Sequence, residues 1–395
     1  MPRYIIVGNG VAGTSAAEAI RKLDPTGPID IFSDEDVPFY YRIKLPEVVT
    51  GEIHEDNIIA KKPNWYEDQG MSLHLMTRIV EIDADKKALM TKDGQKFLYD
   101  RLLLATGSHS FIPPIQGSDK PGLFTLRNMQ DVRTIRKWAE KAEQAVLIGG
   151  GLLGLEAGNG LRKLGKKVTV VEVFPRLLPR QLDTEGASRL QSMLEDMGFA
   201  FCLGAKTTSI EGQDAVEKVI LDTGSSLPAD LILVSAGVRP NLELARQLHL
   251  DMDKGIKVDE YLQTNRPDIY AAGDVTEFAG RVYGIWPAAQ DQGRLAGRNM
   301  AANGQPQAYQ GTVMANTLKV VGIDLASAGE IDAEGQYDAR VKADDHCYRK
   351  IVLDGRTIIG CIMLGDTRGF QKVTKLIQEQ ADASDVIDSL LSGAL

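Results

Sequence analysis

Near the start of the chain, three glycines stand at a spacing that suits phosphate binding. Residues 8–13 read Gly-x-Gly-x-x-Gly, after the apolar run 4–7 and before the helix-like segment 14–23. The first glycine permits a tight turn, the second lets the backbone approach a pyrophosphate, and the third lets the helix pack close to the strand, while the helix N-terminus offers free N–H groups to the anion. The residues expected to contact a dinucleotide here are Gly8, Gly10, Val11, Ala12 and Gly13.

The same pattern returns at residues 149–154, between the apolar run 145–148 and the helix-like segment 155–164. A lone Gly-x-Gly-x-x-Gly is a weak signal, but two of them, each between a strand and a helix, indicate two nucleotide sites. The residues expected at the second site are Gly149, Gly151, Leu152, Leu153 and Gly154.

Acidic residues follow the next strand of each unit. Asp34, with Glu35 beside it, lies about 20 residues beyond the first motif, where a carboxylate accepts hydrogen bonds from a ribose. The alternative is a solvated carboxylate in an acidic loop. Glu172 ends the strand 168–171, where a carboxylate favours the free 2′-OH of NADH and repels the 2′-phosphate of NADPH. The nearby cation Arg176 keeps an NADPH site open as the alternative.

Two cations, Arg42 and Lys44, lie in the aromatic loop 39–46 just past the first motif. They are placed to meet a pyrophosphate or the edge of an isoalloxazine ring. The alternative is that their apolar stems cover hydrophobic surface while the charges stay in water.

Small residues end three further strand-like runs. The run 102–104 leads into 105–107, the run 231–234 leads to Gly237, and residues 269–272 lead to Gly273 and Asp274. A small-residue turn after a buried strand lets a cofactor or another segment come close. Asp274 is a candidate ligand, with a helix cap as the alternative. The residues added to the candidate binding set are Ala105, Thr106, Gly107, Gly237, Gly273 and Asp274.

Pro287 and Ala288 open a helix that is expected from about residue 286. Its N-terminus could stabilise negative charge on a bound group. We also expect a helix over 122–143 and, from residue 313, a small α+β region with a hairpin at 354–355 and an apolar segment over 370–377.

Bulk properties narrow the class of protein. The 395 residues suggest two or three domains, and the net charge of -9 argues against broad binding to nucleic acid or anionic membranes. Cys202, Cys347 and Cys361 form no C-x-x-C or C-x4-C pair, which predicts buried reduced thiols and no metal site. With no recognisable signal peptide and no apolar stretch of roughly 20 residues, we expect a cytoplasmic protein.

Together these motifs resemble the two-dinucleotide flavoproteins of the pyridine nucleotide–disulfide oxidoreductase superfamily. The resemblance implies FAD at 8–13, with Asp274 on its ribityl chain, and NADH at 149–154. It implies an α/β fold with two Rossmann-like domains of the glutathione-reductase type and a small α+β C-terminal domain. The implied bounds are 1–111 and 241–312 for the FAD domain, 112–240 for the NAD domain, and 313–395 for the C-terminal interface domain.

Within the superfamily, the disulfide reductases carry C-x4-C after the FAD glycines, and the NADH peroxidases and oxidases carry one Cys near position 42–46. This sequence has neither, so a thiol relay is not expected. Residues 39–45 and 360–366 are similar to the NADH:rubredoxin reductases and to the flavoprotein module of nitrite reductases. Related ferredoxin reductases pair a Lys with the acid that matches Glu156. Here Glu47 stands at the Lys position, so Lys44 and Glu156 become the flavin-side catalytic candidates.

The resemblance implies that NADH gives a hydride to flavin N5 and that the electrons pass directly to a small redox protein, rubredoxin first. Alternatives are the flavoprotein component of a nitrite- or ferredoxin-linked system, and a flavin-bearing interaction or sensor protein resembling apoptosis-inducing factor. No nucleic acid, membrane or metal is expected, and the chain is expected to be a monomer or homodimer.

Overall fold

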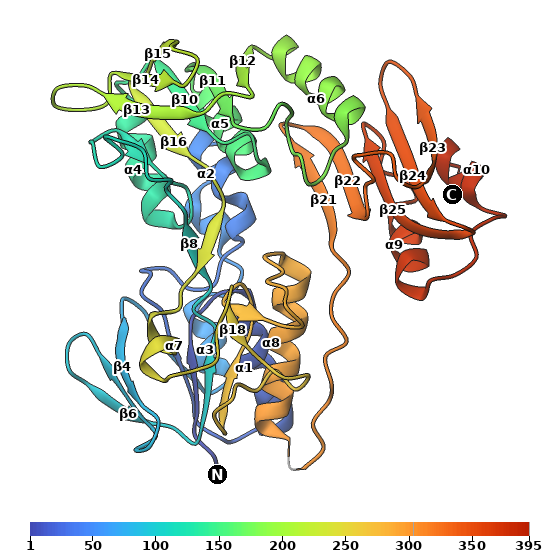
Figure 1. The fold of residues 1–395 in the computed structure, drawn as a ribbon. Helices are drawn as coiled ribbons and strands as arrows, with labels where there is room; N and C mark the ends of the chain where they lie inside the picture. The colour runs from blue at the N-terminus through green and yellow to red at the C-terminus, as the bar shows by residue number, and fades with distance from the viewer. Residues whose placement is uncertain (303, 395) are drawn as a thin grey trace. The chain divides into compact units, whose positions relative to one another are not determined.

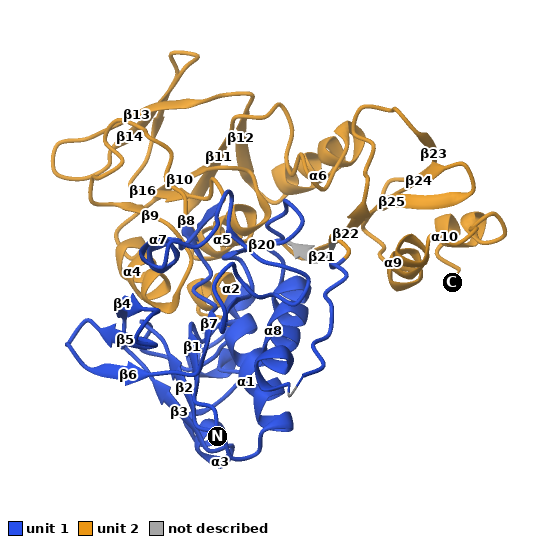
Figure 2. Cartoon of the chain, turned by 60° about the horizontal axis from the view of Figure 1, so that its bottom comes forward, with its two compact units in different colours: residues 1–44, 53–109, 238–312 blue, residues 45–52, 110–237, 313–395 orange. Residues whose placement is uncertain are grey.

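The computed structural model describes residues 1–302 and 304–394, and the side chains of all of these except 315–320. The chain forms two compact units (Figure 2). Unit 1 comprises residues 1–44, 53–109 and 238–312, and unit 2 comprises residues 45–52, 110–237 and 313–395. Each unit therefore assembles from segments that lie far apart in the sequence.

Unit 1 is built on a parallel sheet with the strand order β19-β7-β1-β2-β3. β1 (Tyr4–Val7) is buried throughout, as expected of a parallel strand covered on both faces. It pairs in parallel with β2 (Ile29–Phe32) on one side and with β7 (Arg101–Leu104) on the other. The carboxyl ends of these strands meet at one edge of the sheet, where the first glycine turn leaves β1.

The remaining elements of unit 1 complete this sheet and its flanks (Figure 1). They are α1 (Val11–Leu23), the 3-10 turns Arg42–Lys44 and Glu55–Ile58, α3 (Pro63–Asp68), β3 (Met71–His74), the antiparallel β4 (Ile79–Asp83), β5 (Ala88–Thr91) and β6 (Lys96–Leu98), α7 (Glu243–Gln247), β18 (Ile256–Lys257), β19 (Ile269–Ala271), β20 (Thr276–Glu277) and α8 (Trp286–Ala301). β8 (Ser108–Ser110) pairs with β17 (Val238–Pro240) where the chain leaves and re-enters this unit.

Helices α1 and α8 lie side by side in unit 1 (Figure 1). The contact is close because α8 presents two glycines to the backbone of α1. A Cβ added to Gly293 would lie 2.2 Å from the carbonyl oxygen of Ala12, and one added to Gly297 would lie 2.3 Å from that of Ala16. Only hydrogen atoms fit at these positions, so the two helices touch backbone to backbone.

Unit 2 repeats the first fold with a second parallel sheet, in the order β12-β11-β10-β16-β9. β10 (Gln144–Ile148) is central and pairs in parallel with β11 (Lys167–Glu172). The other elements around this sheet are α2 (Leu45–Thr50), β9 (Leu123–Phe124), α4 (Met129–Ala139), α5 (Leu152–Lys163), α6 (Thr184–Asp196), β12 (Phe199–Leu203), the antiparallel β13 (Thr207–Glu211), β14 (Lys218–Leu221) and β15 (Ser226–Pro228), and β16 (Leu231–Val234).

The helix expected over 122–143 is shorter in the structure. Residues Leu123–Phe124 form β9 at the edge of the sheet, and α4 begins only at Met129. Asn128 and Asp131 form a capping box, in which each side chain accepts a hydrogen bond from the other residue's backbone N–H. This reciprocal cap ends the preceding strand and loop and fixes the start of the helix.

The last part of unit 2 is an antiparallel sheet with the order β21-β22-β25-β24-β23. β24 and β25 form the expected hairpin, with Asp354 opposite Thr357. The elements are β21 (Ala315–Val320), β22 (Ile323–Gly329), β23 (Asp338–Ala343), β24 (Tyr348–Asp354), β25 (Thr357–Leu364), α9 (Phe370–Glu379) and α10 (Ile387–Ser392). Side chains from the sheet and both helices share one hydrophobic core.

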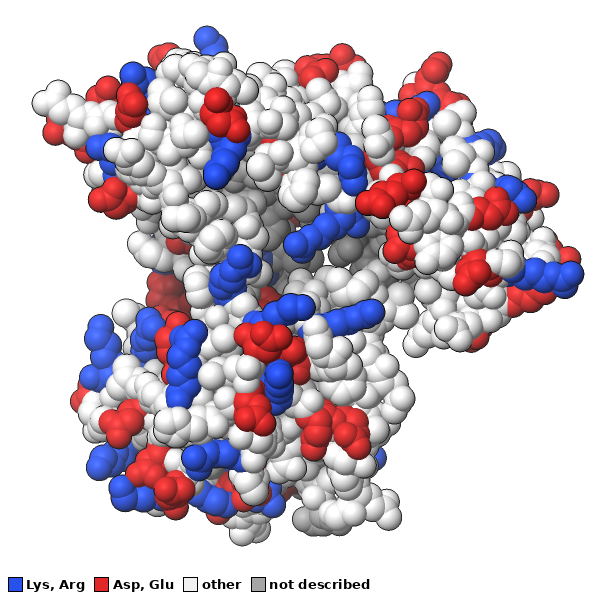
Figure 3. All heavy atoms as spheres, viewed as in Figure 1, with Lys and Arg blue, Asp and Glu red and all other residues white. Residues whose placement is uncertain are grey.

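The α/β fold class expected from the sequence is confirmed by this architecture and by the solved structures described below. The three domain bounds expected from the resemblance stay a prediction. Among the described residues, no helix is both long and apolar enough to cross a membrane. On the face drawn in Figure 3, acidic and basic side chains are intermixed over both units.

Candidate dinucleotide sites

The first glycine turn has the geometry that its sequence requires. Gly8 has a φ of +118°, and a Cβ there would lie 2.0 Å from the carbonyl oxygen of Ala105. A Cβ on Gly13 would lie 1.9 Å from the carbonyl oxygen of Gly8. Both positions therefore exclude any side chain. Gly10 differs, because nothing lies within 4 Å of its added Cβ, so the space above it is open to a ligand.

The second glycine turn has the same arrangement of closed and open positions as the first. Gly149 has a φ of +112°, and its added Cβ would lie 2.3 Å from the carbonyl oxygen of Ser235. The added Cβ of Gly154 would lie 2.7 Å from the carbonyl oxygen of Gly149, while that of Gly151 meets nothing within 4 Å. The open glycines, Gly10 and Gly151, are the N-caps of α1 and α5, and neither helix has a side-chain cap, so their first N–H groups face the open space.

Glu172 is the acidic residue that the structure places at the second turn. Its carboxylate accepts hydrogen bonds from the backbone N–H of Gly150 at 2.6 Å and of Phe174 at 2.9 Å, and the residue is 6% exposed. Each oxygen thus has one backbone donor and can still accept from a ribose hydroxyl. Leu152 and Leu153 form the first turn of α5 beside it, with Leu153 exposed.

In unit 1, the residue equivalent to Glu172 is not Asp34. The N–H of Gly8 bonds to Phe32, just as the N–H of Gly149 bonds to Val171, so Ser33 stands where Glu172 stands in unit 2. Asp34 is exposed one residue further on. Its proposed contact with a ribose stays a prediction.

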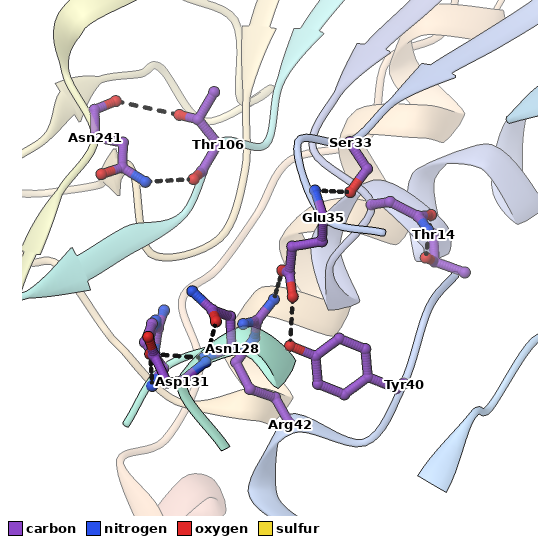
Figure 4. A network of polar contacts seen from close by, with 11 residues as sticks. Thr14, Ser33, Glu35, Tyr40, Arg42, Thr106, Asn128, Asp131 and Asn241 are labelled. Carbon is purple, nitrogen blue, oxygen red and sulfur yellow. Dashed lines mark hydrogen bonds and ion pairs between the residues drawn. The ribbon is translucent and has the colours of Figure 1, made fainter. Parts of the chain in front are cut away.

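Glu35 and Arg42 form an ion pair in unit 1 (Figure 4). Arg42 Nη2 lies 2.6 Å from Glu35 Oε1, and the Tyr40 hydroxyl donates to Glu35 Oε2 at 2.6 Å. The guanidinium also lies over the Tyr40 ring, 5.0 Å from its centroid. Burial works against the charge of Arg42, but Tyr40 and Glu35 together keep its pKa above the usual value. The pair holds the loop after β2 in place, whatever it contacts in a ligand.

The other predicted strand-end residues of unit 1 gather around the first turn. Thr106 exchanges hydrogen bonds with Asn241, whose amide donates to the Thr106 carbonyl at 2.7 Å (Figure 4). The Ser108 hydroxyl donates to Asp274 at 2.8 Å. Positive φ angles occur at Gly107 and Gly273, and also at Gly237, which is the last residue of a segment of unit 2. An added Cβ on Gly273 would lie 3.0 Å from Cβ of Ala12, so this turn lies against α1.

The N-terminus of α8 also lies near the first glycine turn in unit 1. Pro287 stands in the first turn, Ala288 is buried, and Ile285, the N-cap, offers no side-chain hydrogen bond. Trp286 stacks on Tyr41 with ring centroids 5.8 Å apart. The ammonium of Lys44 lies 5.9 Å from the Tyr41 ring centroid. Lys44 is therefore connected to the start of α8 through two aromatic rings.

Glu156, the second catalytic candidate, lies on α5 in unit 2. Its Oε1 accepts the backbone N–H of Val321 at 2.9 Å. Burial, with a smaller contribution from the charge of Glu47, raises the pKa of Glu156 above its usual value, although the Val321 hydrogen bond opposes this. Lys44 and Glu156 belong to different units, so their joint role at a flavin stays a prediction.

Asn9, inside the first turn, was missed by the sequence reasoning. Its Oδ1 accepts from the hydroxyls of Tyr66 at 3.0 Å and Thr14 at 3.3 Å, which fixes the orientation of the amide. Its Nδ2 is buried and has no partner among the described residues. A buried orphan donor beside an open glycine turn suits an acceptor oxygen on a ligand. A polar residue between the first two glycines of the motif was the signal available in the sequence.

Two of the cysteines, Cys347 and Cys361, are poorly suited to redox chemistry. All three are free, and Cys361 is fully buried, which raises its pKa to about 12. Burial and the charge of Asp344 raise the pKa of Cys347. Since the thiolate is the reactive form, neither thiol is activated.

Two glycine turns of this geometry define a protein with two dinucleotide-binding folds, and comparison with known families gives its class. Residues 2–293 match the family model of pyridine nucleotide-disulphide oxidoreductases. Residues 315–381 match that of the rubredoxin NAD+ reductase C-terminal domain. The chain belongs to the pyridine nucleotide-disulphide oxidoreductase family, which confirms the resemblance seen in the sequence. Members of this family are NAD(P)H-dependent oxidoreductases that use FAD and NADH, as expected.

Individual relatives agree with this assignment. The chain is 36% identical over 386 residues to a nitrite reductase [NAD(P)H] of Bacillus subtilis, covering 97% of this chain and 48% of that protein. It is 37% identical over 272 residues to a rubredoxin-NAD(+) reductase of Ectopseudomonas oleovorans, covering 68% of this chain and 71% of the relative. The solved NADH:rubredoxin oxidoreductase of Clostridium acetobutylicum is 27% identical, with a TM-score of 0.84 and 99% of both chains covered. The chain spans about half the length of the nitrite and nitrate reductase relatives that it matches.

Proposed function

We propose that this chain is an NADH-dependent FAD reductase that passes electrons directly to a small iron-containing redox protein, rubredoxin first. The observation that carries the proposal is the pair of open glycine turns, of which only the second is followed by a buried carboxylate, Glu172, at the position that selects NADH. FAD would bind at residues 8–13 and NADH at 149–154.

The residues of unit 1 fit a flavin dinucleotide. The open space above Gly10, the uncapped N-terminus of α1 and the orphan amide of Asn9 all suit a pyrophosphate or ribose. Asp274, which accepts a hydrogen bond from Ser108, would bind the ribityl hydroxyls, and the start of α8 would stabilise negative charge on the ring. When bound, FAD accepts the hydride of NADH and releases its two electrons to an acceptor.

The protein itself would orient the bound NADH. Glu172 would hold the NADH ribose, and the first N–H groups of α5 would hold its phosphates, so that the nicotinamide is positioned for hydride transfer. Because the thiols of Cys347 and Cys361 are not activated, the electrons would leave without a disulfide step. A one-electron iron protein is the acceptor that this route favours.

A second candidate is the flavoprotein component of a nitrite- or ferredoxin-linked reductase. It is supported by the similarity of nearly the whole chain to about half of a nitrite reductase. The two candidates share the NADH half-reaction and differ only in the acceptor.

The test is stopped-flow kinetics on the FAD-loaded protein. The protein is first reduced with NADH and then mixed with rubredoxin, with a [2Fe–2S] ferredoxin, or with air-saturated buffer as the reference. We expect reoxidation by rubredoxin to be the fastest. Faster reoxidation by the ferredoxin would favour the second type of system, and equally slow reoxidation with every acceptor would contradict a reductase and favour a sensor protein.

A further inference from the structure

A lysine is buried in unit 2, away from the glycine turn. Lys350, on β24, is 7% exposed, and its ammonium lies 3.2 Å from Asp183 Oδ2. It also donates to the carbonyl of Asp332 at 2.8 Å. Removing one partner of a buried ion pair leaves the other charge uncompensated, so such a pair is a strong constraint on the segments it joins.

Tyr348, two residues earlier on the same strand, contacts the same carboxylate. Its hydroxyl donates to Asp183 Oδ2 at 2.7 Å, and the residue is 2% exposed. The ring lies against the first turn of α6, because an added Cβ on Gly186 would lie 3.4 Å from Cδ1 of Tyr348, which is ordinary contact distance. Alternate residues of a strand face the same side, so Tyr348 and Lys350 together present one polar face of β24 to Asp183.

Asp183 is the residue at which α6 begins. As the N-cap, it accepts the N–H of Gly186 at 3.0 Å through its other oxygen. A second hydrogen bond joins α6 to the C-terminal region: Arg189, in the second turn of the helix, donates to the carbonyl of Asp344 at 2.7 Å. The first two turns of α6 are thus fixed to the C-terminal sheet.

The segment that leads into Asp183 starts at the nucleotide site. It follows Glu172 directly and contains Leu177, Leu178 and Leu182, all buried. An added Cβ on Gly150 would lie 2.8 Å from Cδ2 of Leu177 and 3.3 Å from Cβ of Glu172, so this segment packs against the glycine turn itself. Asp183, bonded to β24, is joined to Leu177 at the glycine turn by residues 178–182, which form a turn closed by the hydrogen bond from the N–H of Leu182 to the carbonyl of Leu178 at 2.9 Å.

We propose that Tyr348 and Lys350 are positioning residues for the pyridine-nucleotide site: by fixing Asp183, they hold segment 173–182 and the glycine turn in the arrangement that binds NADH. This inference rests on the proposed binding of NADH at 149–154. It assigns the C-terminal sheet a role in nucleotide affinity, although none of its residues needs to touch the nucleotide.

The experiment uses the FAD-loaded full chain and three variants of adjacent residues on β24. Lys350→Met removes the buried cation, and Tyr348→Phe removes only the hydroxyl. Arg349→Met is the matched control, because Arg349 is equally buried but faces the other side of the strand, where it donates to the carbonyl of Leu390 at 2.6 Å and pairs with Asp366. The measurements are KM and kcat with NADH, the Kd for ADP-ribose, the FAD content and the melting temperature.

We expect Lys350→Met and Tyr348→Phe to raise KM for NADH and Kd for ADP-ribose by about 2- to 30-fold, the range for coupling through packed networks. FAD content and kcat should stay near wild type, and Arg349→Met should leave both nucleotide constants unchanged. Equal weakening by Arg349→Met would overturn the proposal, because it would indicate general loosening of the C-terminal sheet. So would wild-type constants in both Lys350→Met and Tyr348→Phe.

Glu172→Ala separates this inference from the proposed function. A wild-type Kd for ADP-ribose in Glu172→Ala would overturn the nucleotide site itself, and the coupling with it. A raised Kd in Glu172→Ala together with wild-type constants in Lys350→Met would overturn the coupling alone.

Discussion

Replacing Gly293 by Ala tests the contact between α1 and α8. In an open helix this change would stabilise the protein by about 1 kcal/mol, because Ala is the better helix former. Here the new Cβ would lie 2.2 Å from the carbonyl oxygen of Ala12 and 2.7 and 2.8 Å from its Cα and carbonyl carbon. All three are backbone atoms, which no rotamer change can move.

The clash must therefore separate the two helices. Ordinary contact begins near 3.4 Å, so α8 has to move away from α1 by about 1 Å at this point. Overpacking of a core costs about 1–3 kcal/mol, with backbone clashes toward the upper end. Subtracting the propensity gain of about 1 kcal/mol, we expect a net loss of about 1–2 kcal/mol in the free energy of unfolding, or a melting temperature lower by roughly 2–8 °C.

The assay is thermal unfolding together with the amount of FAD that the purified protein retains. α1 carries the first glycine motif, so its displacement should lower FAD retention as well as stability. Arg294→Ala, at the exposed neighbouring position, is the control and should change neither. If Gly293→Ala melts at or above the wild-type temperature, helix propensity outweighs the contact, and the two helices are not held together by close backbone packing at Gly293.

Three further changes probe the sites. Glu172→Ala removes the acceptor for two backbone N–H groups and for the ribose; KM for NADH should rise at least tenfold while NADPH is affected less, and an unchanged ratio of the two cofactors would count against this role. Gly10→Val places a side chain in the open space of the first turn, so the protein should fold but be colourless; retention of flavin measured by its absorbance would discredit that site. A Ser replacement of Cys202, Cys347 and Cys361 together should keep turnover with NADH, because burial keeps the thiols of Cys347 and Cys361 protonated and the three cysteines form no redox pair, and loss of activity in the folded triple variant would bring back a thiol mechanism.

Local features were predictable from the sequence. The turn at Gly8 depends on a backbone conformation that glycine adopts at no steric cost, so its spacing from Gly10 and Gly13 shows in the sequence itself. The hairpin at 354–355 is likewise local, with Gly355 at a φ of +59°. The capping box at Asn128 and Asp131 was readable as well, and using it would have moved the start of α4 to its correct place.

Features that depend on distant partners were not predictable. Gly293 and Gly297 weaken a helix when the sequence is read locally, and only the backbone of α1 explains them. In the sequence, Lys350 is simply a charged residue within a strand, and its ion pair with Asp183 is visible only in the folded structure. The shift from Asp34 to Ser33 at the end of β2 emerged only from the hydrogen bonds of Gly8 and Gly149.

Unit 1 is built from three separate segments of the chain, so its parts are synthesised at different times. β19 completes the sheet beside β7, and α8 covers α1, but both are encoded well after the first glycine motif. At about 5–20 residues per second, a ribosome needs tens of seconds to make the intervening chain. During that interval the face of α1 at Ala12 and Ala16 has no α8 to cover it, so a nascent chain arrested before Gly293 should be unable to mature around its flavin.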